Sequence, residues 1–337
     1  MSRGSAEWLL VAGGLLLAAG LAGQVAQAPV GRRFARGTWA VATIVAGADL
    51  LQPFHLRATR DAVLVFDFGD SRLKAFDVHG EPLWQFGQRG HGPWEIAALA
   101  DVQVTSTGEV LLADRGNSRI TVLGPHGERR RMVSLGAPMH RVLPAARGGF
   151  LAAIGHGLWW ERFDSTGRRL GPLPVPAALA GLNGLSAEPI SLALPDARGA
   201  VAFRWSDLVL ILDAAGGVAA SIRGPERLEF PETRSFKAHA DKEGDITVTR
   251  VASDAVWASF AVAAVGPELW VVFAGAKKED GRRLVDIYDP ASGQYKGSLH
   301  LPARPLGIAG LAPNTVALLY DDPEPRIDVL RWIPERP

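Results

Sequence analysis

The stretches VFDFGDSRLKAFDVHGE (65–81) and LADRGNSRITVLGPHGE (112–128) align without a gap at an offset of 47 residues, the difference between positions 112 and 65. Both carry Asp, Gly, Ser and Arg at matching places and close on His-Gly-Glu. A fixed period of this length is typical of a repeat architecture. Each copy has the pattern of two strands separated by a polar turn and followed by a Gly turn, a unit that cannot bury its apolar faces without neighbours. The repeat therefore predicts a β-propeller.

The number of blades follows from the Gly turns and from the last unit of the chain. Turns at Gly80, Gly127, Gly167, Gly216 and Gly293 indicate at least five blades, and glycine suits them because it adopts positive φ without strain. A further unit has only three apparent strands, at 306–310, 315–320 and 327–332. We therefore predict an all-β, six-bladed propeller over residues 38–333.

The missing fourth strand of that unit is expected at the other end of the chain. Residues 38–45, TWAVATIV, alternate as a strand does. They are predicted to pair with residues 327–332 and to close the ring, because closure removes two exposed sheet edges.

Residues 225–256 interrupt the rhythm, with ten charged residues between Glu226 and Asp245 and then a short strand. The segment is either an insertion or a degenerate extra blade. We favour an insertion, because a full blade needs about 40–45 residues.

The segment before the repeats has the pattern of an export signal. No charged residue lies between Trp8 and Gly31, whereas Arg3 precedes this run and Arg32 follows it. We predict that residues 1–31 contain an apolar helix, either a signal peptide cleaved after the small residues Ala26 and Ala28 or an uncleaved membrane anchor. Both alternatives place the propeller outside the cytoplasm, as a periplasmic or extracytoplasmic protein. The second also anchors it to the inner membrane.

Composition excludes several functions. The chain has no cysteine, so disulfides, thiolate metal sites and thiol catalysis are excluded. Its net charge is +1 with basic residues scattered among acids, so nucleic acid is not an expected partner. No cofactor is expected.

The repeat resembles the NHL-repeat six-bladed propellers. In FGQRGHGPWEIAALADVQVTSTGEVLLADRGNSRITVLGPHGE, residues 86–128, the FG..G.G lead-in, the G-E-V strand, the A-D..N-S-R-I turn and the last Gly stand at the spacing of that repeat. The match is good over residues 54–136 and weakens to hydrophobic rhythm and Gly turns beyond them. The resemblance implies an interaction scaffold, as an analogy of fold.

Candidate ligand-binding residues come from the loops around one end of the predicted channel, where propeller loops gather. These are Arg89, His91, Arg115, Asn117, His156, Arg204, Trp205 and His239. The alternative for this mixed set is an ordinary solvated rim, since loops are polar in any case.

No catalytic or metal-binding set is evident in the sequence. His55 and His140 lie on predicted inner strands but two positions apart in the repeat, with no third ligand for zinc. Asp321, Asp322 and Glu324 come from one loop, whereas calcium needs a ring of oxygen ligands. No G-x-S-x-G elbow is present.

The expected function is therefore non-catalytic binding of a protein, peptide or saccharide of the cell envelope on the loop face. A metal-dependent hydrolase or lyase of the propeller type is the alternative. A purely structural element of an envelope assembly is a third reading.

Overall fold

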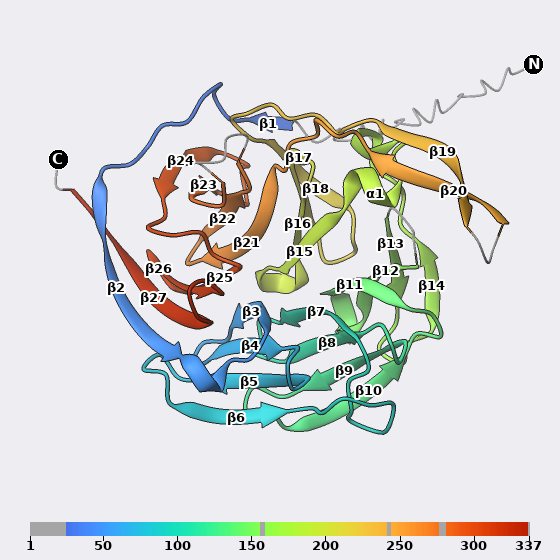
Figure 1. Cartoon of the computed structure of the whole chain (residues 1–337), viewed down its shortest axis with the longest axis horizontal. Helices are drawn as coiled ribbons and strands as arrows, with labels where there is room; N and C mark the ends of the chain where they lie inside the picture. The colour runs from blue at the N-terminus through green and yellow to red at the C-terminus, as the bar shows by residue number, and fades with distance from the viewer. Residues whose placement is uncertain (1–24, 156–158, 241–243, 276–280, 336–337) are drawn as a thin grey trace, which may run out of the picture.

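The computed structural model describes residues 25–155, 159–240, 244–275 and 281–335. Figure 1 shows sheets arranged in a ring around a central channel, and six of them are the blades of a propeller. The predicted all-β, six-bladed fold is confirmed. The predicted helix of the leader falls in residues 1–24, which lie outside the described residues. Within the described ranges, no helix has the length and apolar character needed to span a membrane.

Each blade runs outward from an inner strand next to the channel. The inner strands of blades 1 to 6 are β3 (Pro53–Ala58), β7 (Leu99–Val104), β11 (Met139–Pro144), β15 (Pro189–Ala193), β21 (Ser259–Val265) and β25 (Gly307–Ala312). The second strands are β4 (Val63–Asp67), β8 (Val110–Asp114), β12 (Phe150–Ile154), β16 (Gly199–Phe203), β22 (Glu268–Phe273) and β26 (Thr315–Tyr320).

The outer half of each blade consists of its third and fourth strands. The third strands are β5 (Arg72–Phe76), β9 (Arg119–Leu123), β13 (Trp160–Phe163), β17 (Ser206–Leu212), β23 (Leu284–Tyr288) and β27 (Arg326–Pro334). The fourth strands are β6 (Pro82–Phe86), β10 (Arg129–Ser134), β14 (Arg169–Pro172), β18 (Val218–Arg223), β24 (Tyr295–His300) and, in blade 6, β2 (Gly37–Ala46).

Strand β2 comes from the start of the described chain yet forms the outer edge of blade 6. It runs antiparallel to β27, with Trp39 opposite Trp332 and Val45 opposite Ile327. The Thr43 hydroxyl donates to the Asp328 carboxylate at 2.8 Å, and Val45 is buried in the core between blades 6 and 1. The pairing is that expected of residues 38–45 and 327–332.

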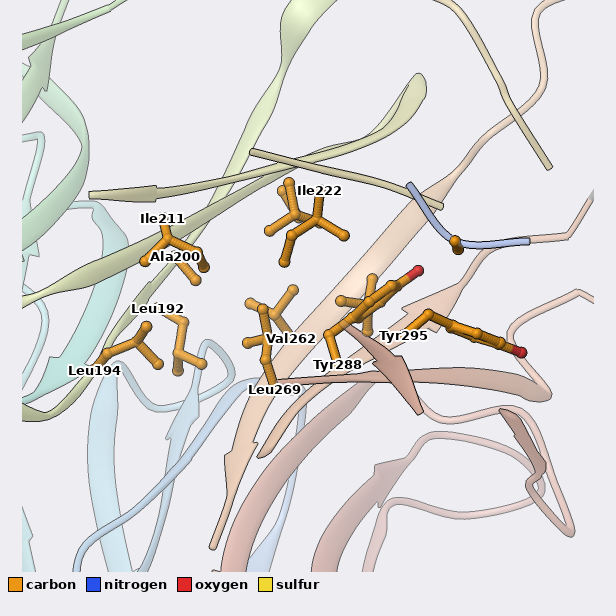
Figure 2. Close-up of a cluster of buried hydrophobic side chains, with 13 residues drawn as sticks. Leu192, Leu194, Ala200, Ile211, Ile222, Val262, Leu269, Tyr288 and Tyr295 are labelled. Atoms are coloured by element: carbon orange, nitrogen blue, oxygen red, sulfur yellow. The ribbon is translucent and has the colours of Figure 1, made fainter. Parts of the chain in front are cut away.

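The apolar cores lie between neighbouring blades, one at each of the six junctions. At the junction of blades 4 and 5, Leu192, Ile211 and Ile222 meet Val262 and Leu269 (Figure 2). Because each sheet packs on two neighbours, no blade forms its core alone.

A strap leads from the leader to β2 across the rim of blades 4 and 5, and we call residues 25–36 the N-terminal strap. It begins with β1 (Val25–Gln27), which pairs in parallel with the outer strand β18. Arg32 forms a bidentate ion pair with Asp286, at 2.8 and 2.9 Å, and stacks over Phe273. Phe34 stacks on His300 with ring centroids 4.2 Å apart. The end of the predicted leader, residues 25–31, is therefore part of the packed structure.

Residues 225–256, predicted as an insertion, connect blades 4 and 5. They contain a two-stranded hairpin, β19 (Thr233–Ala240) and β20 (Gly244–Val251), which projects from the rim in Figure 1. The helices of the described residues are each one turn long. They are α1 (Gly184–Ala187) and the 3₁₀ turns η1 (Gly47–Asp49), η2 (Ala146–Gly148), η3 (Ala177–Leu179) and η4 (Pro195–Ala197).

The repeat motif that identified the fold fastens the loop that enters the blade. Asp67 accepts hydrogen bonds from the backbone N–H of Leu51 and of Gln52, at 2.7 and 2.8 Å. Asp114 accepts from Ala97 and Ala98 at 3.2 and 3.0 Å. Both carboxylates are buried, so each replaces backbone hydrogen bonds that the loop would otherwise lack.

The arginines of the motif lie directly opposite its acids in the hairpin ladders, Arg72 opposite Asp67 and Arg119 opposite Asp114. The sequence of each turn therefore predicts that Arg72 pairs with Asp67 or Asp70 and that Arg119 pairs with Asp114. This prediction is wrong: Arg72 donates to Gln85, and Arg119 donates to the carbonyls of Gly92 and Glu95, at 2.8 and 2.6 Å. Lys74 takes the place of Arg72, with its Nζ 2.8 Å from both Asp67 and Asp70. The buried acids Asp67 and Asp114 are instead engaged by backbone N–H groups of the entering loops.

Candidate functional site

The predicted site residues separate into two groups on the loop face, the face that carries the loops joining successive blades. The first group surrounds the link between blades 1 and 2. His91 Nδ1 and Asn117 Oδ1 are 2.9 Å apart, and Asn117 Nδ2 donates to Asp114 at 2.5 Å. Arg89 Nε donates to the Ser71 hydroxyl at 3.4 Å, and Arg115 is exposed. These contacts hold the turn, which is the architectural role of Asx residues in such loops.

The second group lies between blades 4 and 5. Arg204 pairs with Glu188 at 2.7 Å and stacks over Trp257 at 4.7 Å, and Trp205 meets Trp257 edge to face. His239 lies on β19 opposite Asp245 in the hairpin ladder, and His156 is outside the described residues. The structure therefore brings together pairs of predicted residues, but no contact joins the two groups within the described chain.

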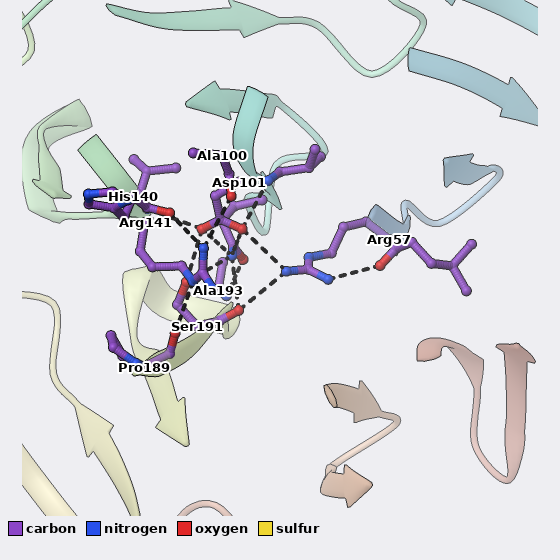
Figure 3. A network of polar contacts seen from close by, with 12 residues as sticks. Arg57, Ala100, Asp101, His140, Arg141, Pro189, Ser191 and Ala193 are labelled. Carbon is purple, nitrogen blue, oxygen red and sulfur yellow. Dashed lines mark hydrogen bonds and ion pairs between the residues drawn. The ribbon is translucent and has the colours of Figure 1, made fainter. Parts of the chain in front are cut away.

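A polar layer across the channel was not predicted from the sequence. We use this name for His55, Arg57, Asp101, Gln103, Arg141 and Ser191, which come from inner strands β3, β7, β11 and β15. Their hydrogen bonds connect blades 1 to 4 near the axis of the ring (Figure 3).

Asp101 is the centre of this layer. Its buried carboxylate accepts hydrogen bonds from the Val142 N–H at 3.1 Å, from the Ser191 hydroxyl at 3.0 Å and from Gln103 Nε2 at 3.0 and 3.1 Å. Arg57 Nη2 lies 3.5 Å from the same carboxylate. Donors from four inner strands therefore converge on one charge.

The two arginines of the layer are held mainly by carbonyl oxygens. Arg141 donates to the carbonyls of Pro189 at 2.9 Å, His140 at 2.8 Å and Ala100 at 3.2 Å. Arg57 donates to the carbonyls of Leu56 at 2.9 Å and Ser191 at 3.3 Å, while its buried Nε has no acceptor among the described residues. One carboxylate thus faces two guanidinium groups.

Burial and the excess of positive charge lower the pKa values of two groups in the layer, His55 and Arg57. Burial, and then the charges of Arg57 and Arg141, lowers the pKa of His55 well below its ordinary value. Burial also lowers the pKa of Arg57, with Asp101 opposing this effect and Arg141 adding to it. His55 is therefore a neutral imidazole in the folded protein at neutral pH.

His55, Asp101 and Arg141 occupy one equivalent position of the repeat, Arg57 and Gln103 occupy another two residues further on, and Ser191 occupies the position between them. Asp101 precedes Val102 and Arg141 precedes Val142, and these two valines pair with Leu112 and Ala152 of the second strands. His55 precedes Leu56, which pairs with Val65 in the same way. His55 and His140 are therefore one position apart in the repeat, where the sequence alignment placed them two apart. Among the described residues, no group of three or more His, Cys, Asp or Glu side chains could hold a metal ion.

Blades 4 to 6 place apolar residues at these same positions. They are Ile190 and Leu192 in blade 4, Ala261 and Ala263 in blade 5, and Gly307 and Ala309 in blade 6. The channel therefore has one polar half and one half of mostly small apolar residues.

Two pockets open from the layer toward opposite faces. The upper pocket, of about 580 Å³, opens on the loop face between blades 3 and 4. Its lining combines His140, Arg141, Ala153 and Gly155 of blade 3 with Asn183, Gly184, Leu185, Glu188 and Pro189 before blade 4, and with Thr249 of the hairpin. The lower funnel, of about 610 Å³, opens on the face of the first-to-second strand turns, and Arg57 contributes to its wall.

The upper pocket is shaped by the chain around α1. Asn183 caps this turn by accepting from the N–H groups of Leu185 and Ser186, both at 3.0 Å, and its Nδ2 donates to Thr233 of the hairpin at 2.9 Å. Leu185 is left 52% exposed at the pocket wall. Of the predicted site residues that the structure describes, Arg204 is linked to this pocket through its ion-pair partner Glu188.

The comparisons with known proteins identify the fold. A putative exported protein from Bacteroides fragilis matches 92% of this chain and 99% of its own, with a TM-score of 0.58 and 9% identity. Virginiamycin B lyase from Staphylococcus aureus matches 88% of this chain and 100% of its own, with a TM-score of 0.52 and 11% identity. The WD40 repeats of RRP9 match 87% and 97%, with a TM-score of 0.52 and 9% identity. No family model and no curated protein sequence matches the chain.

Proposed function

We propose that the protein is an extracytoplasmic binding propeller whose ligand, a peptide or a protein segment, enters the upper pocket. The observation that carries this proposal is the origin of the pocket wall. Blade 3, the α1 turn and the inserted hairpin all contribute to it, and the last two lie outside the repeat. Sequence added to a repeat scaffold at one pocket is typical of a recognition surface.

The lining suits a peptide better than a saccharide. Leu185, Ala153 and Pro189 offer apolar surface, whereas Glu188 offers a carboxylate at the rim. The side chains of Asn183 and Thr249 are already engaged, with Thr233 and Ser235 respectively. Few polar groups thus remain for the many hydroxyls of a sugar, and an apolar side chain of a peptide fits the space.

The proposal is tested with a defined peptide library and a glycan array, each probed with the purified protein. We expect peptides to be selected and their binding to weaken by about tenfold or more in Leu185→Asp, which places a charge in the apolar wall. Leu170→Asp is the matched control, because Leu170 is 49% exposed on the distant strand β14. Equal binding by both variants, or selection of glycans alone, would contradict the proposal.

A metal-dependent hydrolase or lyase is distinguished from a binding protein by chelation. We expect EDTA to leave the melting temperature unchanged. A clear decrease that one divalent ion restores would favour the enzyme.

The strap bears on how the leader is processed. Ala28 is buried, its N–H donates to the Arg223 carbonyl at 3.0 Å, and its carbonyl accepts from Arg227. Cleavage after Ala28 would remove β1 and both of these contacts. We therefore infer that β1 stays with the mature protein, and the intact mass of the protein purified from the membrane and soluble fractions tests this. A mature chain that starts at Pro29 would refute the inference.

A further inference from the structure

The lower funnel lies on the opposite face from the upper pocket and is independent of the proposed function. Its wall comes from blades 1, 2, 4, 5 and 6. Opposite Arg57, at the equivalent repeat positions, are the apolar residues Leu192, Ala263 and Ala309, and the funnel has a volume of about 610 Å³. The other polar residues of the lining lie in the turns at its rim, so the surroundings of Arg57 within the funnel are apolar. A cation in apolar surroundings is a strong selector of charge, because the low dielectric strengthens its field.

The charge of Arg57 is only partly balanced. Its single ion pair among the described residues is with Asp101 at 3.5 Å, longer than a charge-assisted hydrogen bond. That carboxylate is shared with donors from Gln103 and Ser191. The other cation of the layer, Arg141, donates to three carbonyls and forms no ion pair with any acid that the structure describes.

The other charged groups of the funnel compensate one another. Arg60 and Asp61 lie side by side in the exposed turn at its rim, and His126 is exposed on a neighbouring turn. The net charge left at the closed end is therefore positive. A buried charge without a full counter-charge is costly, and a bound anion is one way in which a protein satisfies it.

We propose that the lower funnel binds an oxyanion group, the carboxylate or phosphate of a small molecule, with Arg57 as the principal cation. Arg57 is suited to this role because its side chain is 15% exposed and contributes to the funnel wall, while the carbonyls of Leu56 on its own strand and of Ser191 on β15 fix its position. A preorganised guanidinium binds carboxylate and phosphate with little loss of side-chain entropy.

The probes are inorganic phosphate and acetate, added to the full-length protein at constant ionic strength set with sodium chloride. We expect the melting temperature to rise with the concentration of at least one of them, as binding to the native state requires. The stronger response identifies phosphate or carboxylate as the preferred group. Isothermal titration calorimetry then gives the affinity.

Variants assign the binding to the funnel. Arg57→Met should weaken the affinity by at least about tenfold, the loss expected for a charge-assisted contact. Arg60→Met, which removes an equal charge at the rim of the same pocket, should keep the affinity within about threefold of the wild type because exposed charges act weakly. If Arg57→Met does not fold, Arg57→Lys keeps the charge and should bind more weakly than the wild type.

Three outcomes would overturn the proposal. One is a wild-type protein whose melting temperature and calorimetric titrations do not respond to either anion. The second is a response that chloride reproduces, because this would be a general salt effect. The third is an unchanged affinity in a folded Arg57 variant.

Discussion

The two halves of the channel are built on the same strand register but with opposite chemistry. In blades 1 to 3 the inner-strand positions hold His55, Arg57, Asp101 and Arg141, whereas in blades 5 and 6 they hold alanine or glycine. Ring closure requires the backbone pairing of every blade but leaves these side chains free to differ. The comparison teaches that a propeller can keep its symmetry in the cores between blades and concentrate its polar chemistry in one arc of the channel.

The strongest test of this comparison removes the charge at the centre of the polar half. Asp101→Asn keeps the shape of the side chain but leaves Arg57 and Arg141 without a counter-charge, so we expect the free energy of unfolding to fall by about 3–5 kcal/mol. Urea unfolding followed by tryptophan fluorescence measures this loss. Asp61→Asn, in an exposed turn, should change stability by no more than about 0.5 kcal/mol. A loss below about 1 kcal/mol for Asp101→Asn would mean that the polar half does not depend on its single carboxylate.

The second test uses pH. Because the pKa of His55 is depressed in the folded protein, the unfolded chain binds a proton below pH 6.5 that the native state does not bind. Above pH 6.5, His55 therefore does not reduce the free energy of unfolding. Below pH 6.5, the free energy of unfolding falls by about 1.4 kcal/mol per pH unit until the pH reaches the pKa of His55 in the native state.

The variant His55→Asn should lose this share of the pH dependence, measured as the free energy of unfolding at pH 7 and pH 5. The exposed His126 provides the control, since His126→Asn should keep the wild-type slope. Parallel slopes for His55→Asn and the wild type would show that burial and the charges of Arg57 and Arg141 do not lower the pKa of His55 in the folded protein.

The smallest expected effect is at Ser191, the polar side chain that blade 4 contributes to the layer. Ser191→Ala removes a hydrogen bond to Asp101 and one from Gln103, and we expect a loss of about 1 kcal/mol. Ser235→Ala removes a comparable bond, to Thr249 on the exposed hairpin, and should cost less. If the two variants are equally stable, blade 4 supports the layer through its backbone groups alone.

The fold could be predicted because blades 1 and 2 share side chains that accept hydrogen bonds from backbone N–H groups. Asp67 and Asp114 fasten the loops that enter their blades, so the chain repeats them at a fixed distance. At the same position, the last residue of the second strand, blades 3 to 6 have large side chains that pack in hydrophobic clusters: Ile154, Phe203, Phe273 and Tyr320. The motif therefore fades although the architecture continues.

The polar layer could not be predicted for a different reason. Its residues are far apart in the chain and occupy a position of the repeat that has no common residue type. The turn between β3 and β4, residues 59–62, is also one residue shorter than the turn between β7 and β8, residues 105–109, so that His55 and Asp101 do not align by simple counting. The predicted loop residues were visible as polar residues in turns, and the structure uses His91 and Asn117 to hold one of those turns.

The pairing of β2 with β27 sets an order of events for the newly made chain. Thr43 and Asp328 are hydrogen-bonded in one sheet although 285 residues separate them, so the sixth sheet is completed only when the last strand is available. Blades 1, 2 and 3 consist of consecutive strands and can form their sheets while the rest is still being synthesised. Until the final step, β2 is a strand with both edges unpaired, and such an edge is open to other chains. Joining the two distant strands also requires closing a very long loop, which makes ring completion the slow step of folding.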